Sequence, residues 1–134
     1  EAFEGELQAN EILITSDTIV WHNNKALGKP KDEQDAFDIL KSLSNATHEV
    51  ITSVCFKTNT DSTVMYEVTK VTFNALSDEA IKYYIKNYQP FDKAGAYGIQ
   101  EWIGFVGVSK IEGSYANVMG MPTDKVYEYL INLA

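Results

Sequence analysis

Residues 92–100 hold the side chains best suited to chemistry, because a charged pair, small residues, an aromatic ring and an amide follow one another there. Gly95, Ala96 and Gly98 let the main chain approach a ligand closely, and glycine also accepts a positive φ. Lys93 supplies a cation, and Gln100 supplies an amide that both donates and accepts hydrogen bonds. This order of groups suits a ligand with phosphates at one end and a base at the other.

Two further charged residues, Asp17 and Lys29, lie in segments nearer the N-terminus. The segment 11–15 is short, apolar and partly β-branched, which predicts a buried strand. Asp17 comes just after this segment. Open α/β sheets gather ligands where a strand runs into a loop, although an aspartate there is also a common turn residue. Lys29 lies between a glycine and a proline, which favours a fixed backbone, although a loop lysine is most simply a solvated one.

Four ordered motifs contain these residues. They are Ser-Asp-Thr-Ile-Val at 16–20, Gly-Lys-Pro at 28–30, Asp-Lys-Ala-Gly-Ala-Tyr-Gly-Ile-Gln at 92–100 and Gly-Ser-Tyr-x-Asn-Val-Met-Gly-x-Pro at 113–122. Together they resemble the Maf family, the house-cleaning nucleoside triphosphate pyrophosphatases that were first associated with septum formation in bacteria. The resemblance extends from about residue 12 to the C-terminus.

The resemblance implies a role for each candidate residue. Asp17 corresponds to the family's proton acceptor, and a bound Mg²⁺ or Mn²⁺ would make it a credible base by acidifying the attacking water. Asp17 would ligate that metal, orient the water, or do both. Lys29 matches a lysine that contacts the triphosphate, and Lys93 has a weaker case for the same task. Thr18 and Gln100 match the pair found in the subgroup that acts on dTTP and UTP.

The implied reaction is hydrolysis of the α–β bond of dTTP or UTP, which releases the monophosphate and pyrophosphate. The chain contains no arginine, whereas the family carries a Ser-Pro-Arg-Arg stretch near its N-terminus. That difference favours an alternative, a nucleotide-binding regulator of septum formation or cell division with little turnover. A purine-directed pyrophosphatase of similar fold is disfavoured by Thr18 and Gln100. We interpret the start at Glu1 as an N-terminally incomplete version of a longer protein.

Length and charge limit the class of protein. A chain of 134 residues with 45% hydrophobic content predicts one globular domain, residues 1–134. The net charge is −8, and all eleven residues of the Lys and Arg classes are lysines. This charge argues against a nucleic-acid polymer as partner. No apolar stretch approaches a membrane span, and the single Cys55 indicates no internal disulfide, so we expect a cytoplasmic protein. The expected partner is a nucleoside triphosphate, and the resemblance also allows a homodimer.

The expected elements complete the prediction of fold. Patterning predicts strands before Asn23, at 47–58, at 63–74 with a bulge near Thr69, and at 103–111. It predicts helices capped by Asp32 and Ser77 and a last helix starting near Pro122. The expected class is α/β, with the curved mixed β-sheet flanked by helices of Maf-like proteins, as a single domain missing its first strand and helix.

Overall fold

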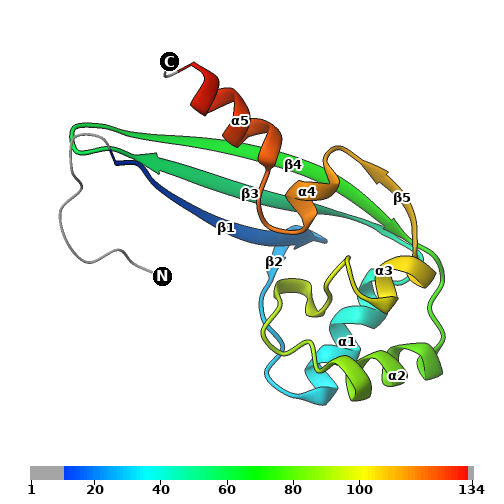
Figure 1. Ribbon diagram of the computed structural model, residues 1–134. Helices are drawn as coiled ribbons and strands as arrows, with labels where there is room; N and C mark the ends of the chain where they lie inside the picture. The colour runs from blue at the N-terminus through cyan, green and yellow to red at the C-terminus, as the bar shows by residue number, and fades with distance from the viewer. Residues whose placement is uncertain (1–10, 133–134) are drawn as a thin grey trace.

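The computed structural model describes residues 11–132, so the polar stretch 1–10 of the sequence lies outside the described residues (Figure 1). In chain order the elements are β1 (Leu13–His22), β2 (Lys25–Leu27), α1 (Glu33–Leu43), β3 (Thr47–Lys57), β4 (Ser62–Phe73), α2 (Asp78–Tyr88), the 3₁₀ turn η1 (Ala94–Ala96), α3 (Trp102–Gly107), β5 (Val108–Glu112), α4 (Tyr115–Val118) and α5 (Thr123–Ile131). Among these helices none is long and apolar enough to cross a membrane.

The five strands form one sheet in the order β2-β1-β3-β4-β5. This confirms the α/β class with a sheet flanked by helices, and it places the strand at 47–57 in the centre. A mixed sheet was expected, but every pairing between the described strands is antiparallel. Tight turns join β1 to β2 and β3 to β4, and such hairpin connections join only antiparallel strands.

Local turn and cap chemistry set the element boundaries. Asn23 and Asn24 have φ angles of 53° and 62°, and this pair of left-handed residues closes the two-residue hairpin between β1 and β2. The Asp32 side chain accepts a hydrogen bond from the Asp35 N–H at 2.8 Å at the start of α1. The Ser77 hydroxyl caps α2 in the same way, at 3.1 Å from the nitrogen of Ala80. Both predicted N-caps are therefore confirmed.

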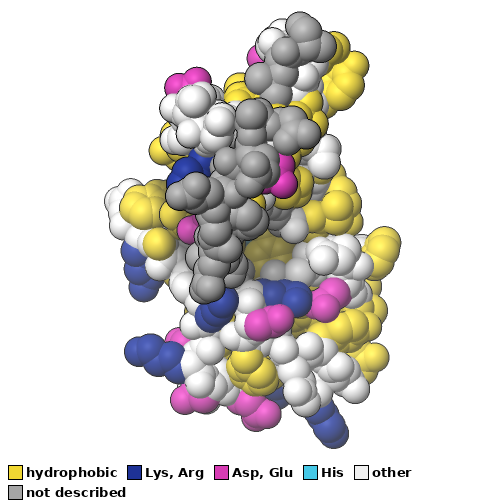
Figure 2. All heavy atoms as spheres, turned by 60° about the vertical axis from the view of Figure 1, so that its left-hand side comes forward, with side chains coloured by type: hydrophobic (Ala, Val, Ile, Leu, Met, Phe, Trp, Pro, Cys, Tyr) yellow, Lys and Arg dark blue, Asp and Glu magenta, His cyan; other side chains and the backbone are white. Residues whose placement is uncertain are grey.

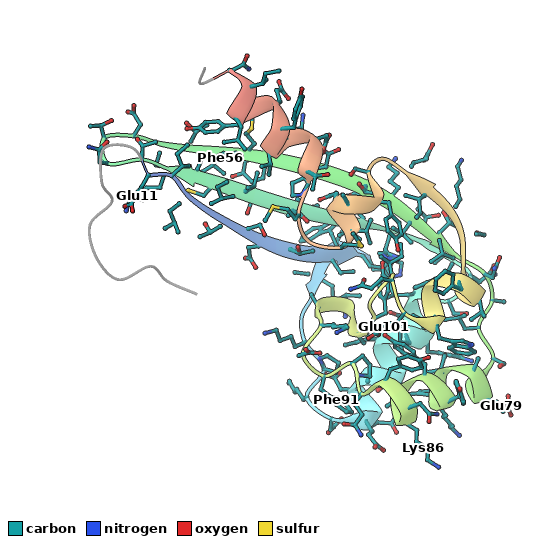
Figure 3. All side chains as sticks on the ribbon, in the orientation of Figure 1. Glu11, Phe56, Glu79, Lys86, Phe91 and Glu101 are labelled. Atoms are coloured by element: carbon teal, nitrogen blue, oxygen red, sulfur yellow. The ribbon has the colours of Figure 1, made fainter. Side chains whose placement is uncertain are left out.

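The two faces of the sheet differ in what packs against them. One face, here called the covered face, includes the buried side chains of Val20, Val50, Val54, Phe56 and Val71. The described helices pack on that face, and Figure 3 shows Phe56 beneath α5. The opposite face, here called the open face, carries exposed apolar side chains, among them Ile19, Tyr66 and Val68, which are 43%, 66% and 49% exposed.

The open face explains an error in the sequence prediction for β4. The bulge expected near Thr69 is wrong, because the pairing of β3 with β4 runs without a shift from Thr47↔Thr72 to Lys57↔Ser62. The apparent slip in alternation arises because Val64, Tyr66 and Val68 are apolar but face outward. Among the described strands, the register of β4 shifts only between Thr72 and Phe73, where β5 pairs.

The strand expected at 103–111 is also only partly correct. Its first half is the short helix α3, Trp102–Gly107, and only Val108–Glu112 is strand. A short apolar run fits a buried helix as well as a strand, so periodicity could not separate the two. α3 then delivers β5 to the sheet edge beside β4.

The elements on the covered face form two groups. α1, α2, η1 and α3 pack over one end of the sheet, in a core that includes Val20, Val50 and Phe73. α4 and α5 cover the middle and the other end, where the rings of Phe56 and Tyr129 stack with centroids 3.9 Å apart. The functional site is formed where these two groups approach each other.

Candidate functional site

A pocket of about 200 Å³ lies between the two groups on the covered face. Three of the five predicted site residues line it together, namely Thr18, Lys93 and Gln100. Tyr97 and Gly120 contribute to its wall from the 92–100 and 113–122 motifs. In Figure 2 the surface is hollowed between the sheet and the helical end, and lysine and acidic side chains lie along the rim of the hollow.

The 92–100 motif is held against the first two motifs by one glycine. The Gly95 N–H donates to the carbonyl of Gly28 at 3.2 Å, which ties this loop to the Gly-Lys-Pro loop. Gly95 has a φ of 73°, and a Cβ added there would lie 2.8 Å from Cγ2 of Val20. The residue is therefore required both by its backbone angle and by close packing on β1.

The fourth motif is held to the sheet by Asn117, which is completely buried. Its Nδ2 group lies 3.2 and 3.1 Å from the carbonyl oxygens of Val50 and Glu67 and 2.8 Å from Oγ1 of Thr69, so its two hydrogens are shared among three acceptors. The Ser16 hydroxyl donates to the carbonyl of Gly120 at 2.8 Å, which joins β1 to the segment after α4. Three of the four motifs, distant in sequence, therefore line one pocket, and the Gly-Lys-Pro motif is tied to it through the bond between Gly95 and Gly28.

The loop residues that follow η1 depend on Tyr84 of α2. The Tyr84 hydroxyl accepts a hydrogen bond from the buried N–H of Gly98 at 3.0 Å and donates to Oε1 of Glu101 at 2.5 Å. Burial, and then the bond to Glu101, raise the pKa of Tyr84 far above its ordinary value, so the hydroxyl stays protonated. Figure 3 shows Glu101 at the junction between the sheet and the helical end.

Lys93 lies between two carboxylates at the pocket. Its Nζ is 3.5 Å from Oδ1 of Asp92 and 4.0 Å from Oε2 of Glu101. The Lys93 side chain is 29% exposed, so the amine stays open to an incoming anion. Its aliphatic part packs on Gly98, where an added Cβ would lie 2.9 Å from Cε of Lys93.

A buried histidine supports the pocket wall from behind. Nε2 of His48 lies 2.6 Å from the hydroxyl of Tyr97. Burial, and to a smaller extent the nearby His22, lower the pKa of His48 to about 4, so its ring is neutral at neutral pH.

Asp17 and Lys29 do not line the pocket. Asp17 alternates with Thr18 along β1 and so lies on the open-face side, where it pairs with Ser53. Its Oδ1 accepts the Thr18 N–H at 3.1 Å, so the carboxylate lies close to the strand backbone. Strand β2 pairs only with residues Val20–His22 of β1. Among residues 11–132, no strand therefore pairs with Asp17 on the side of β1 away from β3. Lys29 is exposed in the loop after β2.

Comparison with known proteins explains why these motifs occur together. The family model described as Maf-like protein matches residues 1–133. The chain belongs to the Maf family. The dTTP/UTP pyrophosphatase of Flavobacterium johnsoniae is 74% identical over 98% of this chain and 68% of the relative. The proteins of the same name from Flavobacterium psychrophilum and Bacteroides fragilis are 65% and 53% identical, over 98% of this chain and 67% and 68% of the relatives.

The side chains of this Maf chain decide whether the protein can hold a metal ion. Mg²⁺ and Mn²⁺ prefer oxygen ligands, chiefly carboxylates. The pocket lining contains no carboxylate, and residues 11–132 contain no group of three or more His, Cys, Asp or Glu that would hold a metal. The described residues therefore do not fit a metal held by the protein alone.

Two residues of this Maf site were not singled out by sequence reasoning. Asn117 was assigned only to a motif, and Thr52 of β3 was not singled out at all. Both are completely buried polar residues beside the pocket. A polar residue in an apolar strand or helix is a signal for such a role, but its partners come from other strands and are invisible in the sequence.

Proposed function

We propose that this protein is a nucleoside triphosphate pyrophosphatase that hydrolyses the α–β bond of dTTP and UTP, giving the monophosphate and pyrophosphate. The observation that carries the proposal is the shared pocket of Thr18, Lys93 and Gln100, which combines hydrogen-bonding groups with a cation. The names of the relatives support the same activity and favour it over the regulator of septum formation.

The proposed assignment of groups follows the geometry of the pocket. Thr18 and Gln100 bind the base, and Lys93 neutralises charge on the phosphates. The pocket volume of about 200 Å³ is below the ~300–1,000 Å³ of typical ligand sites, so it would enclose one end of the nucleotide. The rest of the triphosphate would extend toward the loop of Lys29, which is tied to the pocket through Gly28 and Gly95.

The chemical step proposed is in-line attack of water on phosphorus, for which positioning and charge neutralisation are the main tasks of the protein. Asp17 is the proposed proton acceptor, from the edge of β1 next to Thr18. Lys29 is proposed to stabilise the leaving pyrophosphate. A divalent cation, Mg²⁺ or Mn²⁺, is also proposed to be required. A cytoplasmic location and a homodimer stay predictions.

The test is a nucleotide panel with Mg²⁺, in which pyrophosphate and orthophosphate are assayed separately. We expect pyrophosphate from dTTP and UTP, and we expect Asp17→Asn to lower kcat by roughly 10²-fold or more. Asp61→Asn, an exposed aspartate in the turn between β3 and β4, is the matched control and should leave kcat unchanged.

Each other result would contradict a specific part of the proposal. Orthophosphate as the first product would refute the α–β bond assignment. Nucleotide binding without product would support the regulator instead of the enzyme. Full activity in Asp17→Asn would remove this carboxylate from the mechanism and leave the pocket residues in place.

A further inference from the structure

A short chain of hydrogen bonds leads from the pocket into the core. Oγ1 of Thr18, which lines the pocket, lies 3.1 Å from Oγ1 of Thr52 on the neighbouring strand. Oγ1 of Thr52 in turn donates to the main-chain carbonyl of Asn117 at 3.0 Å. Thr52 and Asn117 are both completely buried, so water does not compete for these bonds.

The number of hydrogens on each group fixes which atom donates in each of these hydrogen bonds. A hydroxyl has one hydrogen to donate and two lone pairs, and a carbonyl oxygen only accepts. The hydrogen of Thr52 is used on the carbonyl of Asn117, so Thr52 can only accept from Thr18. The hydrogen of Thr18 therefore points to Thr52, and Thr18 presents only lone pairs to the pocket.

The carbonyl that sets this direction is itself held in place. The Asn117 side chain donates to groups on both β3 and β4, which holds α4 to both strands. At the other end of α4, the hydroxyl of Thr69 donates to the carbonyl of Ser114 at 3.2 Å, in the same arrangement. Two buried threonines thus fix both ends of this helix to the sheet.

We infer that Thr52 is a positioning residue that makes the Thr18 hydroxyl a hydrogen-bond acceptor, so that the pocket selects a pyrimidine carrying a hydrogen on N3. This inference rests on the proposed function and states how the base is chosen. Uracil and thymine have an N3–H, whereas N3 of cytosine has only a lone pair. The amide of Gln100 does not by itself select a base with an N3–H. It offers both a donor and an acceptor, and it can rotate by 180° to exchange them.

The test compares UTP with CTP, which differ only at the edge that contains N3 and C4. In Thr52→Val the shape is kept but the hydroxyl is removed, and Thr18 is free to donate. We expect the ratio of kcat/KM for UTP over CTP to fall by roughly tenfold, the value of one hydrogen bond. Thr52→Ser keeps the hydroxyl and should keep the ratio within about twofold.

The matched control is Thr47→Val on the same strand. Oγ1 of Thr47 lies 2.8 Å from Oγ1 of Thr72, so this substitution breaks a threonine pair of the same kind at an exposed position outside the pocket. We expect the UTP to CTP ratio to stay at the wild-type value. A ratio in Thr52→Val equal to that of this control would overturn the inference.

Two further measurements separate this inference from the proposed function. Dissociation constants of α,β-imido analogues of UTP and CTP give the same ratio without turnover, so an inactive enzyme that still prefers the uridine analogue would refute only the function. If Thr52→Val does not fold, wild-type protein is tested with 3-methyl-UTP, which lacks the N3–H. Equal kcat/KM or affinity for 3-methyl-UTP and UTP would sink the acceptor assignment.

Discussion

At the scale of a single residue, His48 shows how the fold controls a charge near the site. Its ring touches Tyr97 through Nε2, and Tyr97 lines the pocket. Burial removes the water that would stabilise an imidazolium, and the neighbouring His22 adds a smaller opposing effect, so the pKa falls from 6.5 to about 4. A neutral ring is therefore part of the folded structure.

We predict that this histidine makes the protein less stable as the pH falls from 6.5 toward 4. In that range the unfolded chain binds a proton at this position and the folded chain does not, so the free energy of unfolding decreases, by up to about 3 kcal/mol. The measurement is urea unfolding of wild type and His48→Gln at several pH values. The difference in slope between the two proteins isolates this group.

The control for that experiment is His22→Gln. Desolvation is the larger cause of the shift at His48, so this variant should keep most of the pH dependence. Parallel stability curves for wild type and His48→Gln would show that the buried histidine does not carry the effect.

At the scale of an element, the segment that follows η1 has no regular hydrogen-bonded ladder of its own. The turn at 98–101 is held by the Tyr84 hydroxyl, which contacts both Gly98 and Glu101. This turn presents Gln100 to the pocket, and Glu101 lies near Lys93. Helix α2 thus holds the turn that carries the pocket residue Gln100.

We predict that Tyr84→Phe destabilises the fold by about 1–3 kcal/mol, because the buried N–H of Gly98 loses its acceptor. Tyr88→Phe is the matched control, since this ring stacks on Tyr84 at 5.1 Å but is more exposed. Chemical denaturation measures the difference, and amide exchange at Gly98 should accelerate only in Tyr84→Phe. Equal stability of both variants would mean that the hydroxyl does not hold the turn.

At the scale of the whole molecule, the pocket exists because two groups of elements meet on one face of the sheet. The helical end contacts β1 through Gly95 and Val20, and α4 contacts the neighbouring strands β3 and β4 through Asn117. The distance between these two groups sets the width of the pocket. A single enlarged contact between one of these groups and the sheet should therefore affect both the stability of the protein and the shape of the pocket.

We predict that Gly95→Ala costs roughly 2–5 kcal/mol, from a left-handed backbone angle and from overpacking against Val20. Gly28→Ala is the control for stability, because an added Cβ there meets nothing within 4 Å. Thermal and urea unfolding measure the loss of stability in each of the two variants. A loss no larger for Gly95→Ala than for Gly28→Ala would show that this contact does not set the spacing.

Local chemistry explains which parts of the fold were predictable. The caps at Asp32 and Ser77 and the asparagine turn are determined by residues within a few positions, so they are readable in the sequence. The strand expected over 103–107 was wrong because a short apolar run fits a helix as well as a strand. The bulge expected near Thr69 was wrong for a different reason. Hydrophobic patterning assumes that apolar side chains point inward, whereas Tyr66 and Val68 lie on the open face.

The candidate site divides in the same way. The motifs identify the residue types for a nucleotide, and the family follows from them, because type and order are properties of the chain. Which side chains meet depends on strand alternation and register. Neighbours Asp17 and Thr18 point to opposite sides of β1, and Thr18 meets Thr52 only because β1 and β3 pair in that register. Contacts between strands far apart in sequence exist only after the sheet has formed, and those contacts set the polarity of the pocket.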